Sequence, residues 1–273
     1  MILLVTNEWH KHNSNEWPPN YYNDLKIYRL STIMQRLALL IPTTSRGREC
    51  WVTVEDTYLY NLTFSTYLQT QEVDIITTFY IGTDDEDKVW NEDNKEKFKN
   101  ILQNNNINCI FVSMQNIEVG YVTKMWNKLF EVSYNDHNDY FYQCGDDINF
   151  TTKHWISDSI QQLKLNNDIG LSGPKNNNHH ILTQGMVSRK HMLIFGYFFP
   201  EEIRNHYCDD WYNLVYKPNH LFKMEQHYCS NDGGTPRYKF SKKANAINAI
   251  KKVLNTIVRR DKQKLNEYIR SVK

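Results

Sequence analysis

Long apolar runs are missing from this sequence. No stretch approaches the roughly 18 apolar residues that a membrane-spanning helix requires. The short apolar run at residues 2–5 has no basic region before it and no small-residue cleavage site after it. The five cysteines are scattered, odd in number and without a Cys-x-x-Cys pair, a pattern that favours reduced thiols. We therefore expect a soluble, cytoplasmic protein with no secretory signal and no membrane span.

An excess of charge of either sign is also missing. The 32 Lys and Arg residues nearly balance the 31 Asp and Glu residues, so no strong overall field favours nucleic acid or an anionic membrane, and we expect no nucleic-acid partner. The chain is instead rich in aromatic residues, with 18 Tyr, 12 Phe and 7 Trp, and in Asn. Such side chains suit the faces and hydroxyls of sugars, although the base composition of the genome would also explain the Asn content.

Apolar runs and helical patterns alternate along the middle of the chain. Strands are predicted at 37–41, 73–81, 108–113, 140–144 and 169–173, and helices at about 52–68, 94–103, 119–132 and 153–163. This alternation predicts a mostly parallel α/β sheet, whose ligands bind beyond the carboxyl ends of the strands. Later, a strand within 180–188 leads into a helix near His191, Pro200 opens a short helix, and 213–238 is expected to be irregular.

The same pass suggests three parts. Residues 1–36 form an N-terminal extension, residues 37–240 a single α/β domain, and residues 241–273 a basic amphipathic C-terminal helix that packs on the domain. A break of this helix near Asp261 is one alternative. Its charges are either solvated or dock on a partner or an acidic surface.

Gly145, Asp146 and Asp147 directly follow the predicted strand 140–144. Two adjacent carboxylates in a partly dry site raise each other's pKa unless a cation compensates them. Mg²⁺ and Mn²⁺ bind carboxylate and phosphate oxygens, and glycine allows the backbone to approach a ligand closely. Such acidic pairs also occur in turns and helix caps, but the position after an apolar strand favours a metal site.

Together with other loops, this motif resembles the GT-A glycosyltransferases, in which an Asp-x-Asp or related motif binds the metal-diphosphate of a nucleotide sugar. The resemblance covers about 37–238 and rests on four segments: 39–46 as the first nucleotide loop, 82–84 as the second, 144–148 as the acidic motif, and 208–211. It implies the GT-A fold, a Rossmann-like α/β domain with helices flanking a mostly parallel central sheet. The Asn-rich, signal-free chain also resembles glycosyltransferases of large DNA viruses.

Gly145 departs from the family pattern, because it occupies the first acidic position. The resemblance then implies that Asp147 is the metal ligand, with Asp146 nearer the ribose or bound to the ion through water. A lost first acid also keeps open a catalytically inactive relative that binds a glycan or a nucleotide.

The resemblance implies further residues for the nucleotide. Pro42, Thr43 and Arg46 would line it, with Arg46 reaching a phosphate, and Asp84 would face the base or ribose. Lys124, on the helix before the acidic strand, is a further candidate. The alternatives are that Arg46 and Lys124 are surface charges and that Asp84 belongs to an acidic turn.

Asp209 and Asp210 precede Trp211 late in the chain. An inverting transfer needs a carboxylate that deprotonates the acceptor hydroxyl, and this segment resembles the catalytic-base segment of inverting GT-A enzymes, with Trp211 as a face for sugar stacking. The sequence does not separate the two aspartates as the base. The alternative for one of the two is that it caps a helix that begins at Trp211. A retaining enzyme would not need this base.

His227 and Arg237 complete the expected site. His227 lies where an additional metal ligand is plausible, although a structural histidine is the alternative. Arg237, in the glycine-containing segment 233–238, would neutralise the departing diphosphate.

The sequence therefore predicts a metal-dependent glycosyltransferase that uses Mn²⁺ or Mg²⁺. It would transfer a sugar from a nucleotide diphosphate donor, with UDP as the expected nucleotide, to a hydroxyl of a saccharide or protein-linked acceptor. The absence of a Gly-rich Walker-type loop argues against a nucleotidyltransferase or phosphohydrolase that uses the same carboxylates.

Overall fold

The computed structural model describes residues 34–233 and 244–272, so that most of the predicted N-terminal extension lies outside the described part. The strands are β1 Gln35–Thr43, β2 Ile75–Thr83, β3 Asn108–Ser113, β4 Tyr140–Gln143, β5 Ile148–Phe150, β6 Leu171–Lys175, β7 Met186–Ser188 and β8 Leu221–Asn231. The helices are α1 Ser65–Thr70, α2 Glu92–Asn104, α3 Val122–Asn135, α4 Trp155–Leu165, α5 Lys190–Phe195, α6 Cys208–Tyr216 and α7 Ala244–Ser271, and α1 is preceded by a 3-10 turn at Val54–Asp56 and a π-helical segment at Leu59–Phe64. None of the described helices combines the length and apolar character that crossing a bilayer requires.

The strands form one sheet in the order β3-β2-β1-β4-β7-β6-β8-β5. The pairs β1–β2, β1–β4, β2–β3 and β6–β8 are parallel, and β4–β7, β6–β7 and β5–β8 are antiparallel. The predicted fold class, an α/β protein with a mostly parallel sheet flanked by helices, is confirmed.

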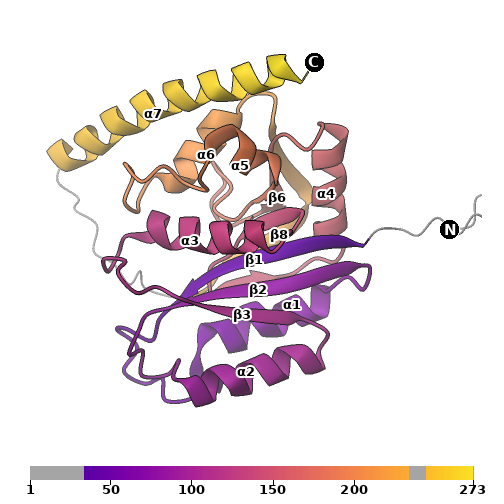
Figure 1. The fold of residues 1–273 in the computed structure, drawn as a ribbon, viewed down its shortest axis with the longest axis vertical. Coiled ribbons are helices and arrows are strands. Elements are labelled where there is room, and N and C mark those ends of the chain that lie inside the picture. Colours follow the sequence, from indigo (N-terminus) through magenta and orange to yellow (C-terminus); the bar gives the residue numbers. More distant parts are fainter. Residues whose placement is uncertain (1–33, 234–243, 273) are drawn as a thin grey trace, which may run out of the picture. The chain divides into compact units, whose positions relative to one another are not determined.

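The side chains of β1 alternate between two buried clusters. Leu37, Leu39 and Ile41 join the core under α1, α2 and α4, and Ala38 and Leu40 join the core under α3, α5, α6 and α7. Figure 1 shows α3, α5 and α6 on one side of the strands and α1 and α2 on the other. Because both faces are covered, β1 is a continuous apolar run, which is why the sequence revealed it.

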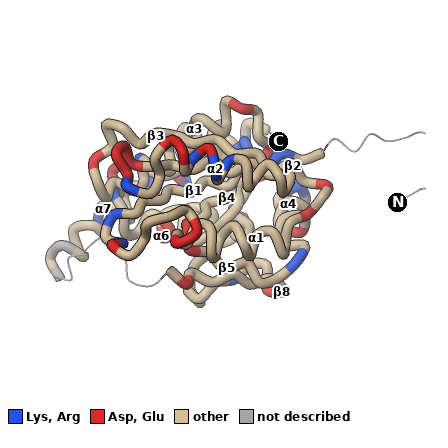
Figure 2. The backbone as a smooth tube through the Cα atoms, turned by 90° about the horizontal axis from the view of Figure 1, so that it is seen from below, with Lys and Arg blue, Asp and Glu red and all other residues tan. Residues whose placement is uncertain are grey.

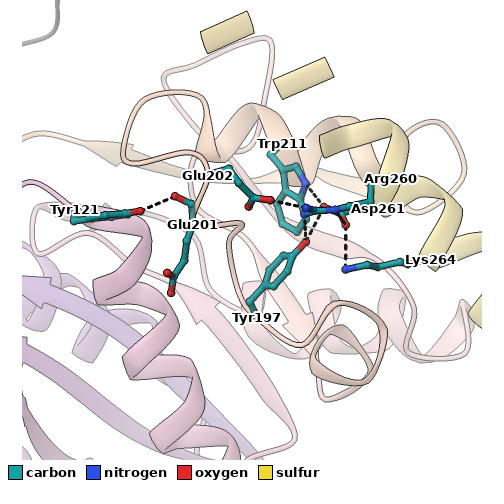
Figure 3. A network of polar contacts seen from close by, with 8 residues as sticks. All are labelled: Tyr121, Tyr197, Glu201, Glu202, Trp211, Arg260, Asp261 and Lys264. Atoms are coloured by element: carbon teal, nitrogen blue, oxygen red, sulfur yellow. Dashed lines mark hydrogen bonds and ion pairs between the residues drawn. The ribbon is translucent and has the colours of Figure 1, made fainter. Parts of the chain in front are cut away.

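The second half of the fold differs from the prediction in three places. Much of the segment expected to be irregular forms α6 and the 11-residue strand β8. No helix starts at Pro200, where the chain forms a turn. The C-terminal helix α7 is continuous through Asp261, because Asp261 is fully buried and accepts hydrogen bonds from Trp211 and Tyr197 (Figure 3).

Candidate active site

A cavity of about 570 Å³ lies beyond the carboxyl ends of β1, β2 and β4. Its size is within the range of small-molecule sites, about 300–1,000 Å³. The strand ends supply Pro42, Thr43, Thr44, Gly82, Asp84, Gln143, Gly145, Asp146 and Asp147, and other parts supply, among others, Trp126 of α3, Asn178, Gln184, the segment 205–210 and Asn231. The edge of the sheet that the sequence predicted as the ligand site is therefore hollow.

The cavity is acidic. Five aspartates line it, namely Asp84, Asp146, Asp147, Asp209 and Asp210, and none of the described lining residues is Lys or Arg. Figure 2 shows acidic positions at α6, whose first turn contains two of these aspartates. An anionic ligand such as a nucleotide diphosphate needs a compensating cation in such a place.

Asp146 is held from β1. Thr43 Oγ1 donates a hydrogen bond of 2.7 Å to Asp146 Oδ2, and the Asp146 residue is only 3% exposed. Because β1 and β4 are parallel neighbours, the first predicted nucleotide loop and the acidic motif meet at this contact.

Asp147 is packed between two glycines. A Cβ atom at Gly233 would lie 2.1 Å from Asp147 Oδ2, and one at Gly145 would lie 2.6 Å from Asp147 Oδ1. A side chain at either position would therefore displace Asp147. Gly145 thus leaves room for the Asp147 carboxylate in this conformation.

The loops after β1 and β2 are joined through Asp87. Its carboxylate accepts hydrogen bonds from Ser45 N and Ser45 Oγ, both at 2.7 Å, and from Thr44 Oγ1 at 3.1 Å. Burial raises the pKa of Asp87, but hydrogen bonds from the backbone and hydroxyl of Ser45 and from the Trp90 and Val89 amides outweigh burial, so the pKa is lowered. Asp87 thus holds the loop after β1 in place.

Of the predicted nucleotide contacts, Pro42, Thr43 and Asp84 line the cavity, but Arg46 and Lys124 do not. The Arg46 side chain is 60% exposed, with Nε 3.9 Å from Asp84 Oδ2, and lines a smaller adjacent hollow. Lys124 Nζ lies 3.5 Å from Glu201 and 4.6 Å from the Tyr121 ring centre.

Asp209 lies in the first turn of α6, where the positive end of the helix dipole favours an acid. Its Oδ1 accepts a hydrogen bond of 3.0 Å from Gln143 Nε2, and Gln143 Oε1 accepts one of 2.5 Å from the Tyr212 hydroxyl. Burial raises the pKa of Asp209 to about 6 and also raises that of Asp210. Neither Gln143 nor Tyr212 was predicted, because their roles depend on packing between β4 and α6.

Trp211 is not a sugar platform. It is fully buried, and its Nε1 donates to Asp261 Oδ2 at 3.0 Å; the expectation of a stacking face there is wrong. Trp126 and Tyr207 line the cavity instead. Trp126 follows Lys124 by two positions on a helix that the sequence had revealed, whereas Tyr207 has a φ of 77°, a conformation that no sequence pattern indicated.

His227, the further predicted metal ligand, is not among the residues that line the cavity. His227 is buried on β8, with Nε2 2.8 Å from Asp158 Oδ2 of α4. Within 34–233 and 244–272, no three His, Cys, Asp or Glu side chains are gathered closely enough to hold an ion by themselves. Arg237 lies outside the described residues.

No protein-family model and no curated protein matches the sequence. Among solved structures, residues 1–349 of S. aureus TarS in complex with UDP-GlcNAc have a TM-score of 0.56 to this chain at 11% identity, with 86% of this chain and 72% of that chain covered. The fragment in complex with UDP has a TM-score of 0.49 at 10% identity, with 72% and 60% covered. A Bacillus anthracis protein assigned as a glucose-1-phosphate thymidylyltransferase, in complex with sucrose, has a TM-score of 0.47 at 14% identity, with 73% and 90% covered.

These identities are low, so the likeness concerns the fold alone. The chain spans less than two thirds of the length of the UDP-bound TarS fragment. The TM-score of 0.56 shows that this chain shares the mixed α/β fold of the TarS fragment that was crystallised with UDP-GlcNAc.

Proposed function

We propose that the protein is a glycosyltransferase that moves a sugar from a nucleotide diphosphate donor, with UDP as the expected nucleotide, to a hydroxyl of a saccharide or protein-linked acceptor. The observation that carries the proposal is the acidic cavity at the strand ends, which has Asp146 and Asp147 after β4 and Asp209 at the start of α6. The fold shared with the TarS fragment bound to UDP-GlcNAc supports this choice.

Pro42, Thr43 and Asp84 would contact the nucleoside part of the donor, since they line the cavity beside Asp146. The cavity fits a divalent ion that arrives with the donor, because Mg²⁺ or Mn²⁺ commonly takes one or two protein carboxylates and completes its shell with phosphate and water. Asp147, supported by Asp146, would hold it. When bound, the ion would neutralise charge on the leaving diphosphate. This proposal does not use His227.

Asp209 is the proposed general base. Gln143 and the Cys208 thiol contact Oδ1, at 3.0 and 3.6 Å, whereas no described residue contacts Oδ2 within hydrogen-bond distance. As the acceptor oxygen bonds to the anomeric carbon, Asp209 Oδ2 takes its proton, and the bond from that carbon to the diphosphate oxygen breaks. The product has inverted configuration. A pKa of about 6 keeps Asp209 mainly ionised near neutral pH and makes it a stronger base than an exposed aspartate.

The test is a thermal-shift panel of nucleotide sugars, each with and without Mn²⁺. We expect one donor to stabilise the protein only when Mn²⁺ is present, and Asp147→Asn to abolish that stabilisation. Asp232→Asn is the matched control, because its carboxylate contacts Ser230 and Asn149 and does not line the cavity. Failure of every donor to stabilise the protein with the metal would contradict the proposal.

Gly145 favours a second candidate, a catalytically inactive protein that binds a nucleotide sugar or a glycan. This candidate predicts donor binding without formation of glycosylated product or free nucleotide diphosphate. Mass spectrometry of incubations with a binding donor and a panel of saccharide acceptors separates the two.

A further inference from the structure

We infer that Gln143 and Tyr212 are positioning residues that hold Asp209 with Oδ2 toward the cavity and favour its ionised form. The inference rests on the proposed function, because it assigns Asp209 as the base. It gives a role to Gln143, which lines the cavity, and adds Tyr212, which is not among the lining residues.

The three side chains form one buried chain of hydrogen bonds. Gln143, the last residue of β4, is 2% exposed, and Tyr212, one turn after Asp209 on α6, is fully buried. The Tyr212 hydroxyl donates to Gln143 Oε1 at 2.5 Å, and Gln143 Nε2 donates to Asp209 Oδ1 at 3.0 Å. A strand end and a helix start are thereby joined at the proposed base.

The orientation of the Gln143 amide determines its effect. A primary amide has an acceptor end and a donor end. Because Tyr212 donates to the acceptor end, the donor end lies toward Asp209 and stabilises its charge. In the reverse orientation, Oε1 would lie against an ionised carboxylate, and two acceptors would oppose each other. The ionised carboxylate thus sets the orientation of the amide, and the Tyr212 hydroxyl holds the amide there by donating to Oε1.

Other titratable groups near Asp209 do not supply this stabilisation. From α6, Asp210 raises the pKa of Asp209 by charge repulsion, and the neutral Cys208 thiol is a weak donor. His206, Asp146 and Asp147 line the same cavity, and none of its described lining residues is Lys or Arg. The Gln143 amide is thus the strongest described donor to this carboxylate.

The experiment measures the titration of Asp209 itself. Carboxyl ¹³C NMR of the full chain gives its midpoint in the parent, in Tyr212→Phe and in Gln143→Met, with Asp209→Asn to assign the signal. We expect Gln143→Met to raise the midpoint by about one pH unit, the size of a lost hydrogen bond to a charged group, and Tyr212→Phe to raise it by a smaller amount. Tyr216→Phe is the matched control, since it removes another buried α6 hydroxyl, one that contacts His191.

Each substitution should also move the acid limb of the kcat/KM profile to higher pH by the amount of its own NMR shift, whereas the control should lower only stability. An unchanged Asp209 midpoint in both Tyr212→Phe and Gln143→Met would overturn the inference, and so would an equal shift in Tyr216→Phe. If Gln143→Met does not fold, Tyr212→Phe decides. Absence of transfer by the parent protein would contradict the proposed function while leaving the NMR result interpretable.

Discussion

The environment of Asp209 combines burial with a single amide donor, so its charge is available for chemistry but is costly for the fold. We expect Asp209→Asn to lower transfer by about 10²–10⁴-fold, the usual contribution of a general base, and to leave donor binding intact. Asp210→Asn, which changes the neighbouring residue, should retain most of the activity. Steady-state kinetics and donor titration of both variants test this assignment, and an inactive Asp210→Asn with an active Asp209→Asn would reverse it.

The raised pKa of Asp209 also predicts a dependence of stability on pH. The folded-state pKa of about 6 lies above the ordinary value of 3.8, so the folded state binds the proton more tightly than the unfolded state. The contribution of Asp209 to stability therefore falls as pH rises from about 4 to about 6. Because asparagine does not ionise, Asp209→Asn does not lose stability over this pH range. Allowing for the partial exposure of the side chain, we expect the variant to be about 1–2 kcal/mol more stable at pH 7.5.

Urea unfolding of the parent and of Asp209→Asn at pH 4.5 and pH 7.5 measures this effect. The stability difference should be larger at the higher pH. A difference that is the same at both pH values would mean that burial of Asp209 does not oppose its ionisation.

Gly145 offers a test of packing against charge. Gly145→Asp would give the acidic pattern expected from the resemblance, but it places a Cβ atom 2.6 Å from Asp147 Oδ1, so the Asp147 carboxylate must turn away from its present position. We expect metal-linked donor affinity to fall in Gly145→Asp and to fall similarly in Gly145→Ala, which adds the Cβ without charge. Calorimetric titration of the donor with Mn²⁺ measures both, and tighter binding by Gly145→Asp alone would show that the missing acid, rather than packing, limits the site.

At the scale of elements, the sequence predicted the strands that are buried on both faces and the helices that have a regular apolar face. β1 and β2 are buried on both faces and therefore appear as apolar runs, and α3 has a regular apolar face. β8 has the sequence LFKMEQHYCSN and is only partly buried, so no alternation marks it. The sequence offered a helix beginning at Trp211 as an alternative, but α6 begins earlier, at Cys208, after Tyr207 in a left-handed conformation.

The helix α7 is joined to α6 by Asp261, which is fully buried (Figure 3). Its carboxylate accepts from Tyr197 Oη at 2.7 Å, from Trp211 Nε1 at 3.0 Å and from Arg260 Nε at 2.9 Å. Asp261→Ala would leave the buried Trp211 Nε1 without its acceptor, whereas Arg260 would keep its contacts with Glu202 and the Tyr197 hydroxyl, so the substitution should cost about 1–3 kcal/mol of stability. Glu267→Ala, an exposed change on the same helix, should stay within about 0.5 kcal/mol.

Chemical unfolding of both variants measures the difference, and near-equal stabilities would mean that α7 is held by apolar contacts alone.

The pKa of Asp261 also predicts the effect of acid. Burial raises the pKa of Asp261, but the hydrogen bonds from Arg260 and Tyr197 outweigh burial, so that the pKa lies below its ordinary value of 3.8. The stabilisation from this carboxylate is therefore present above about pH 4 and is lost as the pH falls through the folded-state pKa.

At the scale of the whole molecule, the candidate site is assembled from segments far apart in sequence. Thr43, Asp84, Asp146 and Asp209 come from the ends of three strands and the start of α6. The β-α alternation predicted that the first three would meet, because parallel strands end at the same edge. It did not place α6 across from them, since that depends on the antiparallel β7 and on packing between α6 and the sheet. For the same reason it missed the contacts of Gln143 and Tyr212 with Asp209.

One sheet separates two buried clusters, and β1 contributes to both. The described residues from Met34 onward belong to one compact unit, so the two sides should unfold together. We expect the transitions followed by tryptophan fluorescence and by far-ultraviolet circular dichroism to coincide.

A donor with Mn²⁺ at about 100 times its Kd should then shift the whole transition by about 2.7 kcal/mol. Because the described part of the site has no set of three protein ligands for an ion, Mn²⁺ alone should shift it little. Separate transitions would show that the two sides of the sheet unfold independently. A large shift from Mn²⁺ alone would show that the protein binds the ion without the donor.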